Sequence, residues 1–153
     1  MKRSERMAPV QRVLGSVERD RAKDLGAAQK VLGEAEARLQ DLKQYHADYA
    51  GSFQQRAKVG QSAMALRDFQ VFLERLQEAI RQQEHVVAQA REGLAGSTGR
   101  WQGAAQRVKA IDTVVDKWQQ DERRSAGRLE QKDADERAQR SAARNNMNGA
   151  GKT

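Results

Sequence analysis

One hydrophobic repeat runs without interruption from Leu66 to Leu129. Its members alternate steps of three and four residues, which is the spacing of heptad a and d positions and predicts a coiled-coil helix. They are Leu66, Phe69, Leu73, Leu76, Ile80, Gln83, Val87, Ala90, Leu94, Ser97, Trp101, Ala104, Val108, Ile111, Val115, Trp118, Glu122, Ser125 and Leu129. A repeat this long with no change of step favours one long helix over strands or a compact globule. We term the a and d positions of this repeat, and of the earlier repeat described next, the seam.

A second repeat with the same spacing precedes the first. It consists of Leu25, Ala28, Leu32, Ala35, Leu39, Leu42, His46, Tyr49 and Phe53. The intervening segment "QQRAKVGQSA" is polar and contains Gly60, so it predicts a tight turn. Ser62 stands where a hydroxyl could cap the following helix.

The two repeats fit one antiparallel register in which each a residue faces a d residue. Phe53 then faces Phe69, Ala35 faces Val87, and the pairing is symmetric about Gln61. We therefore predict an all-α fold, a long antiparallel two-helix coiled coil with unequal helices. Helix 1 is expected at about 10–56, the turn at about 57–62 and helix 2 at about 63–143. These form one domain over 1–145, and 146–153 is expected to be a disordered tail.

The longer second helix is expected to overhang the first beyond about residue 112, so that Val115 and Trp118 lack a full partner. One feature argues against a continuous second helix. "GLAGSTGRWQG" contains Gly93, Gly96 and Gly99 followed by Gly103, and glycine disfavours helix. A loop there would give a three-helix bundle. The unbroken heptad phase favours a continuous helix instead, and close approach opposite Gly26 is one reason for such glycines.

Composition excludes several classes of protein. The chain has no cysteine, so neither a disulfide framework nor a thiolate metal site can form. No apolar run approaches the length of about 18 residues that predicts a transmembrane helix. The basic N-terminus lacks the apolar core of a signal peptide. We therefore expect a cytoplasmic protein, and the net charge of +7 favours acidic partners.

No set of residues predicts catalysis. His46 and His85 lack the neighbours of a usual metal site. The C-terminal "GAGKT" resembles the end of a Walker A loop, but the leading glycine, the preceding strand and the following helix are missing. A two-helix rod also lacks a cavity of catalytic size. We expect no enzyme activity and no cofactor or metal.

A second apolar stripe lies beside the seam near the turn. Phe72 and Ala79 occupy heptad g positions next to the d residue Leu76. Helix 1 carries a matching set, Arg38, Leu42, Tyr45 and Tyr49. The antiparallel register places the two sets side by side, with Tyr49 next to Phe72. Either this stripe is an interface, where aromatic and arginine anchors are enriched, or its g residues merely widen the core.

The basic charge has two interpretations of its own. A nucleic-acid-binding coiled coil would present a basic stripe. Here positive and negative charges are interleaved, and only Lys2, Arg3, Arg6 and Arg12 form a locally basic group. A solvated surface or an acidic protein partner is therefore favoured over nucleic acid, and no wide stripe flanked by lysines predicts direct membrane insertion.

Three segments resemble the FliJ family of flagellar export proteins: "AEARLQDLKQYHADY", "LRDFQVFLERLQEAIRQQ" and "RLEQKDADERAQRSAAR". The resemblance implies a coiled coil similar to the central stalk of rotary ATP synthases, with one end inserted in the hexameric export ATPase FliI. It also implies contact with the cytoplasmic domain of the export gate protein FlhA, and the escort of export chaperones. Such a protein would be cytoplasmic, peripheral to the inner membrane at the export apparatus, and needed for flagellum assembly and motility.

The resemblance also implies where the partners bind. The gate would contact Leu42, Tyr45, Tyr49, Phe72, Leu76 and Ala79. The ATPase ring would contact Val13, Leu14, Val115 and Trp118. Two other classes stay open. The analogous stalk of a virulence type III secretion system would look the same, and genomic neighbours would separate the two. A nucleic-acid-binding coiled coil would show binding that weakens steeply with salt.

Overall fold

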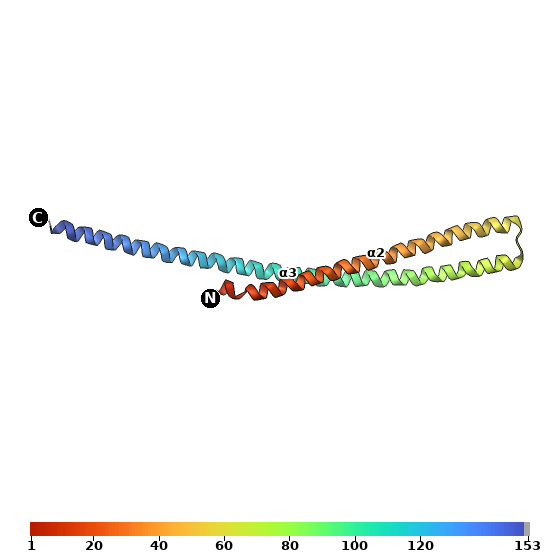
Figure 1. The fold of residues 1–153 in the computed structure, drawn as a ribbon, viewed down its shortest axis with the longest axis horizontal. Coiled ribbons are helices and arrows are strands. Elements are labelled where there is room, and N and C mark those ends of the chain that lie inside the picture. The colour runs from red at the N-terminus through yellow and green to blue at the C-terminus, as the bar shows by residue number, and fades with distance from the viewer. Residues whose placement is uncertain (152–153) are drawn as a thin grey trace. The chain divides into compact units, whose positions relative to one another are not determined.

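The structure, a computed structural model, describes residues 1–151 and is all-α over that range. It contains a short helix α1 (Arg3–Arg6) and two long helices, α2 (Ala8–Val59) and α3 (Ala63–Ala150) (Figure 1). The predicted all-α hairpin with a longer C-terminal helix is confirmed. Helix α3 includes residues 146–150, for which the sequence predicts a disordered tail. The prediction for residues 152 and 153 lies outside the described range.

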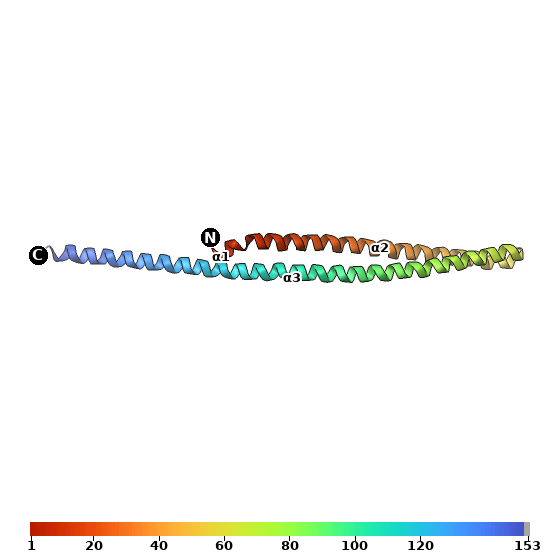
Figure 2. The ribbon, with the colours of Figure 1, turned by 90° about the horizontal axis from the view of Figure 1, so that it is seen from below.

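The chain divides into two compact units, one of residues 16–105 and one of residues 1–15 with those from 106 onward. In the first unit, α2 and α3 run antiparallel on either side of the turn (Figures 1 and 2). The rings of Phe53 and Phe69 stack with centroids 5.5 Å apart, which is one of the predicted pairs. Farther from the turn, the Gln83 side chain donates to the Ala35 carbonyl oxygen at 3.0 Å.

Burial follows the seam through this unit. Ala35, Val87, Ser97 and Ala104 are its buried residues, and all four are seam positions. The other α3 seam residues from Leu66 to Trp101 are partly buried. No continuous row of residues outside the a and d positions is buried in this unit. The heptad pattern therefore accounts for how the two helices associate.

The turn is shorter than predicted, because α2 continues to Val59. Gly60 has φ +83°, a left-handed conformation that glycine adopts without steric cost. The Ser62 hydroxyl accepts a hydrogen bond from the backbone N–H of Ala65 at 3.2 Å, so the predicted cap is present. These two residues reverse the chain within three positions.

Helix α3 passes through the glycine-rich stretch without a break, so the loop and the three-helix bundle are wrong. The proposed close approach opposite Gly26 is also wrong. A Cβ atom built at Gly26, Gly93, Gly99 or Gly103 meets no heavy atom within 4 Å, and one at Gly96 meets only the flexible end of Arg100. Packing within the chain therefore requires none of these glycines.

The second unit corrects the predicted overhang. The sequence predicts that α3 loses its partner at about residue 112. Gln11 hydrogen-bonds Asp112 at 2.9 Å, at that predicted end, but Ser4 also bonds Glu122, farther along α3. The reason is that α2 starts at Ala8 and α1 adds a further helical turn. Val115 is consequently 3% exposed rather than unpartnered. From Arg123 to Ala150 every residue is exposed.

Candidate interaction surfaces

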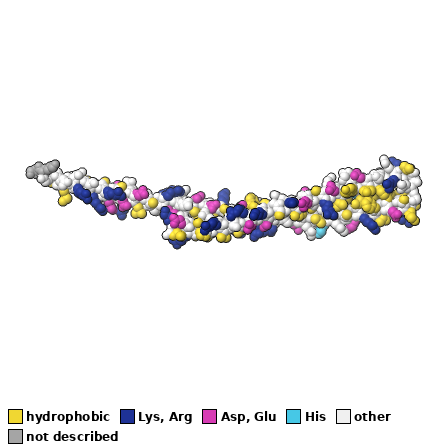
Figure 3. All heavy atoms as spheres, in the orientation of Figure 1, with side chains coloured by type: hydrophobic (Ala, Val, Ile, Leu, Met, Phe, Trp, Pro, Cys, Tyr) yellow, Lys and Arg dark blue, Asp and Glu magenta, His cyan; other side chains and the backbone are white. Residues whose placement is uncertain are grey.

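An exposed aromatic cluster lies on one side of the seam near the turn. The ring of Tyr49 contacts the ring of Phe72 with centroids 5.0 Å apart, as the register predicts. Phe72 nevertheless stays 42% exposed and Tyr45 57% exposed. Figure 3 shows hydrophobic side chains gathered near the turn. These rings are not sealed in the core, so they are available to another molecule.

The remaining residues of the predicted gate site lie beneath and beside the rings. Leu42, Leu76 and Ala79 are partly buried. Leu42 and Leu76 are seam residues, so they serve packing and form the floor between exposed rings. The structure thus brings all six predicted residues to one side of the hairpin, with the aromatic ones outermost.

The opposite side of the seam is polar. Its heptad e positions are Gln29, Glu36, Lys43 and Ala50 on α2, and Gln70, Gln77, Glu84 and Arg91 on α3. Across it the Arg91 guanidinium pairs with the Glu36 carboxylate at 3.5 Å, both side chains being largely solvated. The large apolar side chains beside the seam in this region therefore lie at g positions and not at e positions.

Two members of this apolar side were missed in the sequence. Val31 and Val86 are 55% and 43% exposed and line one groove with Gly93. Val31 lies seven residues before Arg38, and Val86 lies seven after Ala79. Extending the g positions by one heptad on each helix would have found both. We define the g flank as Val31, Arg38, Tyr45, Phe72, Ala79, Val86 and Gly93.

The predicted ATPase contacts have different environments in the other unit. Val13 is 62% exposed, whereas Val115 is buried and Leu14 and Trp118 are partly buried. Leu14 lies between two shallow apolar depressions, one formed with Pro9, Val10 and Val13 and the other with residues of α3 including Ile111 and Val114. Val13 and Leu14 are thus accessible, but Val115 is not.

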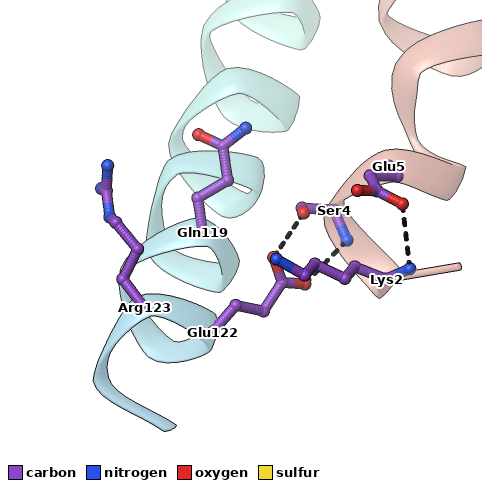
Figure 4. A pocket seen from close by; sticks show the side chains of 6 residues that line it. All are labelled: Lys2, Ser4, Glu5, Gln119, Glu122 and Arg123. Atoms are coloured by element: carbon purple, nitrogen blue, oxygen red, sulfur yellow. Dashed lines mark hydrogen bonds between the residues drawn. The ribbon is translucent and has the colours of Figure 1, made fainter. Parts of the chain in front are cut away.

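The N-terminal segment is fastened to α3 by polar contacts (Figure 4). The Ser4 backbone N–H and hydroxyl both donate to the Glu122 carboxylate, at 3.1 and 2.6 Å. The hydroxyl bond is the largest cause of a pKa of Glu122 below its ordinary value, and nearby Lys2 and Arg3 add to it. The Arg3 guanidinium lies 4.1 Å from the Trp118 ring centroid, a cation–π contact. Together these contacts hold α1 over Trp118.

Within residues 1–151, no group of three or more His, Cys, Asp or Glu side chains is placed to hold a metal ion. None of the described helices is both long enough and apolar enough to cross a membrane.

These features define an antiparallel coiled-coil protein that carries an exposed apolar surface on one side of its hairpin. The family model described as "Flagellar FliJ protein" matches residues 2–147, nearly the whole chain. The chain therefore belongs to the FliJ family, which confirms the resemblance and makes it a non-catalytic protein related to flagellar export. No curated protein and no solved structure matches it.

Proposed function

We propose that this protein is the stalk of a flagellar export ATPase, that it binds the export gate through the g flank, and that it escorts export chaperones. Family membership supports a role in flagellar export. The observation that carries the gate site is the exposure of Tyr45, Tyr49 and Phe72 on one side of a hairpin whose other side is polar. Exposed aromatic rings that surround aliphatic side chains form favourable anchors for a partner protein.

Gate binding assigns a role to each residue of this surface. Phe72 and Tyr45 enter the partner, while Tyr49 bridges the exposed ring of Phe72 to the buried side of Phe69. Leu42, Leu76 and Ala79 provide the apolar floor. Such a surface can bind the cytoplasmic domain of FlhA without rearrangement of the helices, because its rings are already exposed.

We assign the ATPase contact to the unit that contains the N-terminus. Val13 and Leu14 present an apolar surface there, with Val10 40% exposed beside them. Lys2, Arg3, Arg6 and Arg12 make the same segment basic, which favours an acidic lining in the FliI ring. Val115 supports this surface from inside, and Trp118 lies under Arg3. A paired helix end of this kind can bias the arrangement of ring subunits through unequal contacts.

The proposed mechanism is mechanical. The ring contact promotes assembly and ATP hydrolysis of FliI, and the gate contact couples these events to export driven by protons. The protein would act at the cytoplasmic face of the inner membrane, held there by its partners. Motility would depend on both surfaces.

Affinity capture tests the proposal. The full chain, tagged at its C-terminus, is expressed in its own flagellated host, and the captured proteins are identified by mass spectrometry. We expect both the export ATPase and the gate protein, with the gate lost in a Tyr45→Ala/Phe72→Ala variant and the ATPase retained. Capture of neither would contradict the proposal. Salt-sensitive retention of DNA or RNA in a filter assay would favour the nucleic-acid alternative.

A further inference from the structure

A groove of about 470 Å³ lies on the g flank beyond the aromatic cluster. Ala28, Ala90 and Gly93 make its floor from small side chains, and Val31 and Val86 form exposed apolar walls. Arg100 and Ser97 also line it, and the Arg100 guanidinium donates to the Ser97 hydroxyl at 3.2 Å. The groove is open to solvent and mainly apolar, with Gln89 as a further polar residue in its lining.

Gly93 keeps this groove open although the chain itself does not need the space. A Cβ atom at Gly93 meets nothing within 4 Å, so alanine would fit and would favour the helix. The space beside Gly93 is therefore open to side chains of a second molecule. A helix that approaches closely is the usual partner of such a surface.

The groove is continuous with the aromatic cluster. Phe72, Ala79, Val86 and Gly93 stand at consecutive g positions of α3, one heptad apart in each step. At about 1.5 Å per residue they span about 30 Å, or roughly six helical turns. An amphipathic helix repeats its apolar side chains with the same period, so one helix can contact all four positions.

Charged residues beside the g flank indicate which charge the bound helix should carry along its edges. On α2 the neighbouring c positions carry Glu34, Asp41 and Asp48, all exposed. On α3 the corresponding positions carry Arg75, Gln82 and Gln89. The three α2 residues are acidic, with Arg38 of the flank itself between Glu34 and Asp41, whereas the three α3 residues include no acidic side chain. A helix seated between them is complementary when the edge facing α2 carries lysine or arginine.

We infer that the gate segment bound by the g flank is an amphipathic helix of about six turns that reaches from Phe72 to the Gly93 groove, with basic residues along the edge facing α2. This inference rests on the proposed gate binding and adds the extent, the secondary structure and the charge of the bound segment. Binding completes a three-helix arrangement over residues 28–97 of the hairpin.

The test is isothermal titration of the full chain with the purified cytoplasmic domain of the gate protein. Gly93→Leu fills the groove, and Val86→Glu charges its wall. The matched control is Val71→Glu, because Val71 is also 43% exposed but lies at an f position on the outer side of α3. Phe72→Ala tests the proposed function separately, and melting curves are recorded for every variant.

We expect Gly93→Leu and Val86→Glu to weaken binding at least roughly tenfold and Val71→Glu to leave it unchanged. Gly93→Leu should retain or raise the melting temperature, which separates lost binding from unfolding. If Phe72→Ala weakens binding and both groove variants bind like wild type, the extended helix is wrong and gate binding stands. If no variant weakens binding, the proposed function itself fails. Tighter binding by Asp41→Lys would overturn the basic edge.

Discussion

The ring of Tyr49 on α2 lies edge-on to the ring of Phe72 on α3, with an interplanar angle of 71°. Tyr49 also contacts Phe69, whose ring stacks on Phe53 inside the seam. One tyrosine therefore joins the buried packing near the turn to the exposed g flank. Single substitutions should consequently affect either the stability of the hairpin or the proposed binding, depending on which side chain is changed.

Stability should depend on the seam more than on the flank. Val87→Ala removes a side chain that is 3% exposed, and we expect it to lower the free energy of unfolding by about 2 kcal/mol. Phe72→Ala should cost about 1 kcal/mol or less, mainly the contact with Tyr49. Urea unfolding followed by circular dichroism measures both. A larger loss for Phe72→Ala would show that its ring belongs to the core.

The register can be tested by crosslinking, because the natural chain has no cysteine. In an Ala35→Cys/Val87→Cys variant the two residues face each other across the seam, and mild oxidation should form an intramolecular disulfide. Ala37 is exposed, so Ala37→Cys/Val87→Cys is the control and should stay reduced under the same conditions. Mobility on non-reducing gels separates the products. Equal oxidation of the two variants would contradict a single register.

Glycine substitutions should have opposite effects in the helix and in the turn. Gly99→Ala should raise the free energy of unfolding by about 1 kcal/mol, because the new methyl group meets open space. Gly60→Ala should lower it by about 1–2 kcal/mol, because φ +83° is strained for any residue with a Cβ atom. Thermal melts compare the two variants with wild type. Destabilisation by Gly99→Ala would reveal a packing role that the structure lacks.

The attachment of the N-terminal segment should depend on acid. The pKa of Glu122 lies below its ordinary value because Ser4 donates to the carboxylate. The stabilisation is therefore complete above the ordinary pKa of about 4.3 and is lost as pH falls through the lowered pKa. An NMR titration should show the Ser4 amide signal moving with a midpoint below about 4.3.

Two variants serve as controls for this titration. Glu122→Gln should abolish the transition, since an amide does not titrate in this range. Ser4→Ala should move the carboxyl midpoint of Glu122 upward, towards that of an ordinary glutamate, because the hydroxyl donor is gone. A wild-type midpoint at or above about 4.3 would mean that the contact does not favour the charged carboxylate.

The hairpin could be predicted from the sequence because heptad spacing is visible in the order of residues and does not depend on the details of side-chain packing. The paired register and the contact between Tyr49 and Phe72 follow from it, and the cap at Ser62 follows from the serine at the start of the second helix. How far the N-terminal segment extends along α3 was not predictable in this way. It depends on the contact between Ser4 and Glu122, two polar residues far apart in sequence that no hydrophobic pattern connects.

The candidate surface was only partly predictable for a related reason. Aromatic residues at Tyr45 and Phe72 are conspicuous, whereas Val31 and Val86 resemble ordinary core residues until their exposure is known. The glycines posed the same problem. Their spacing predicts either a loop or a close contact within the chain, whereas in the structure the space beside Gly93 is open.

The affinity of the flank for the gate protein tests the central claim most directly. Calorimetric titration of the FlhA cytoplasmic domain should give at least roughly tenfold weaker binding for Tyr45→Ala/Phe72→Ala than for wild type, with helicity preserved. Val71→Ala, an equally exposed position on the outer side of the helix, should bind like wild type. Unchanged affinity of the double variant, per folded molecule, would contradict the claim that these exposed rings bind the gate.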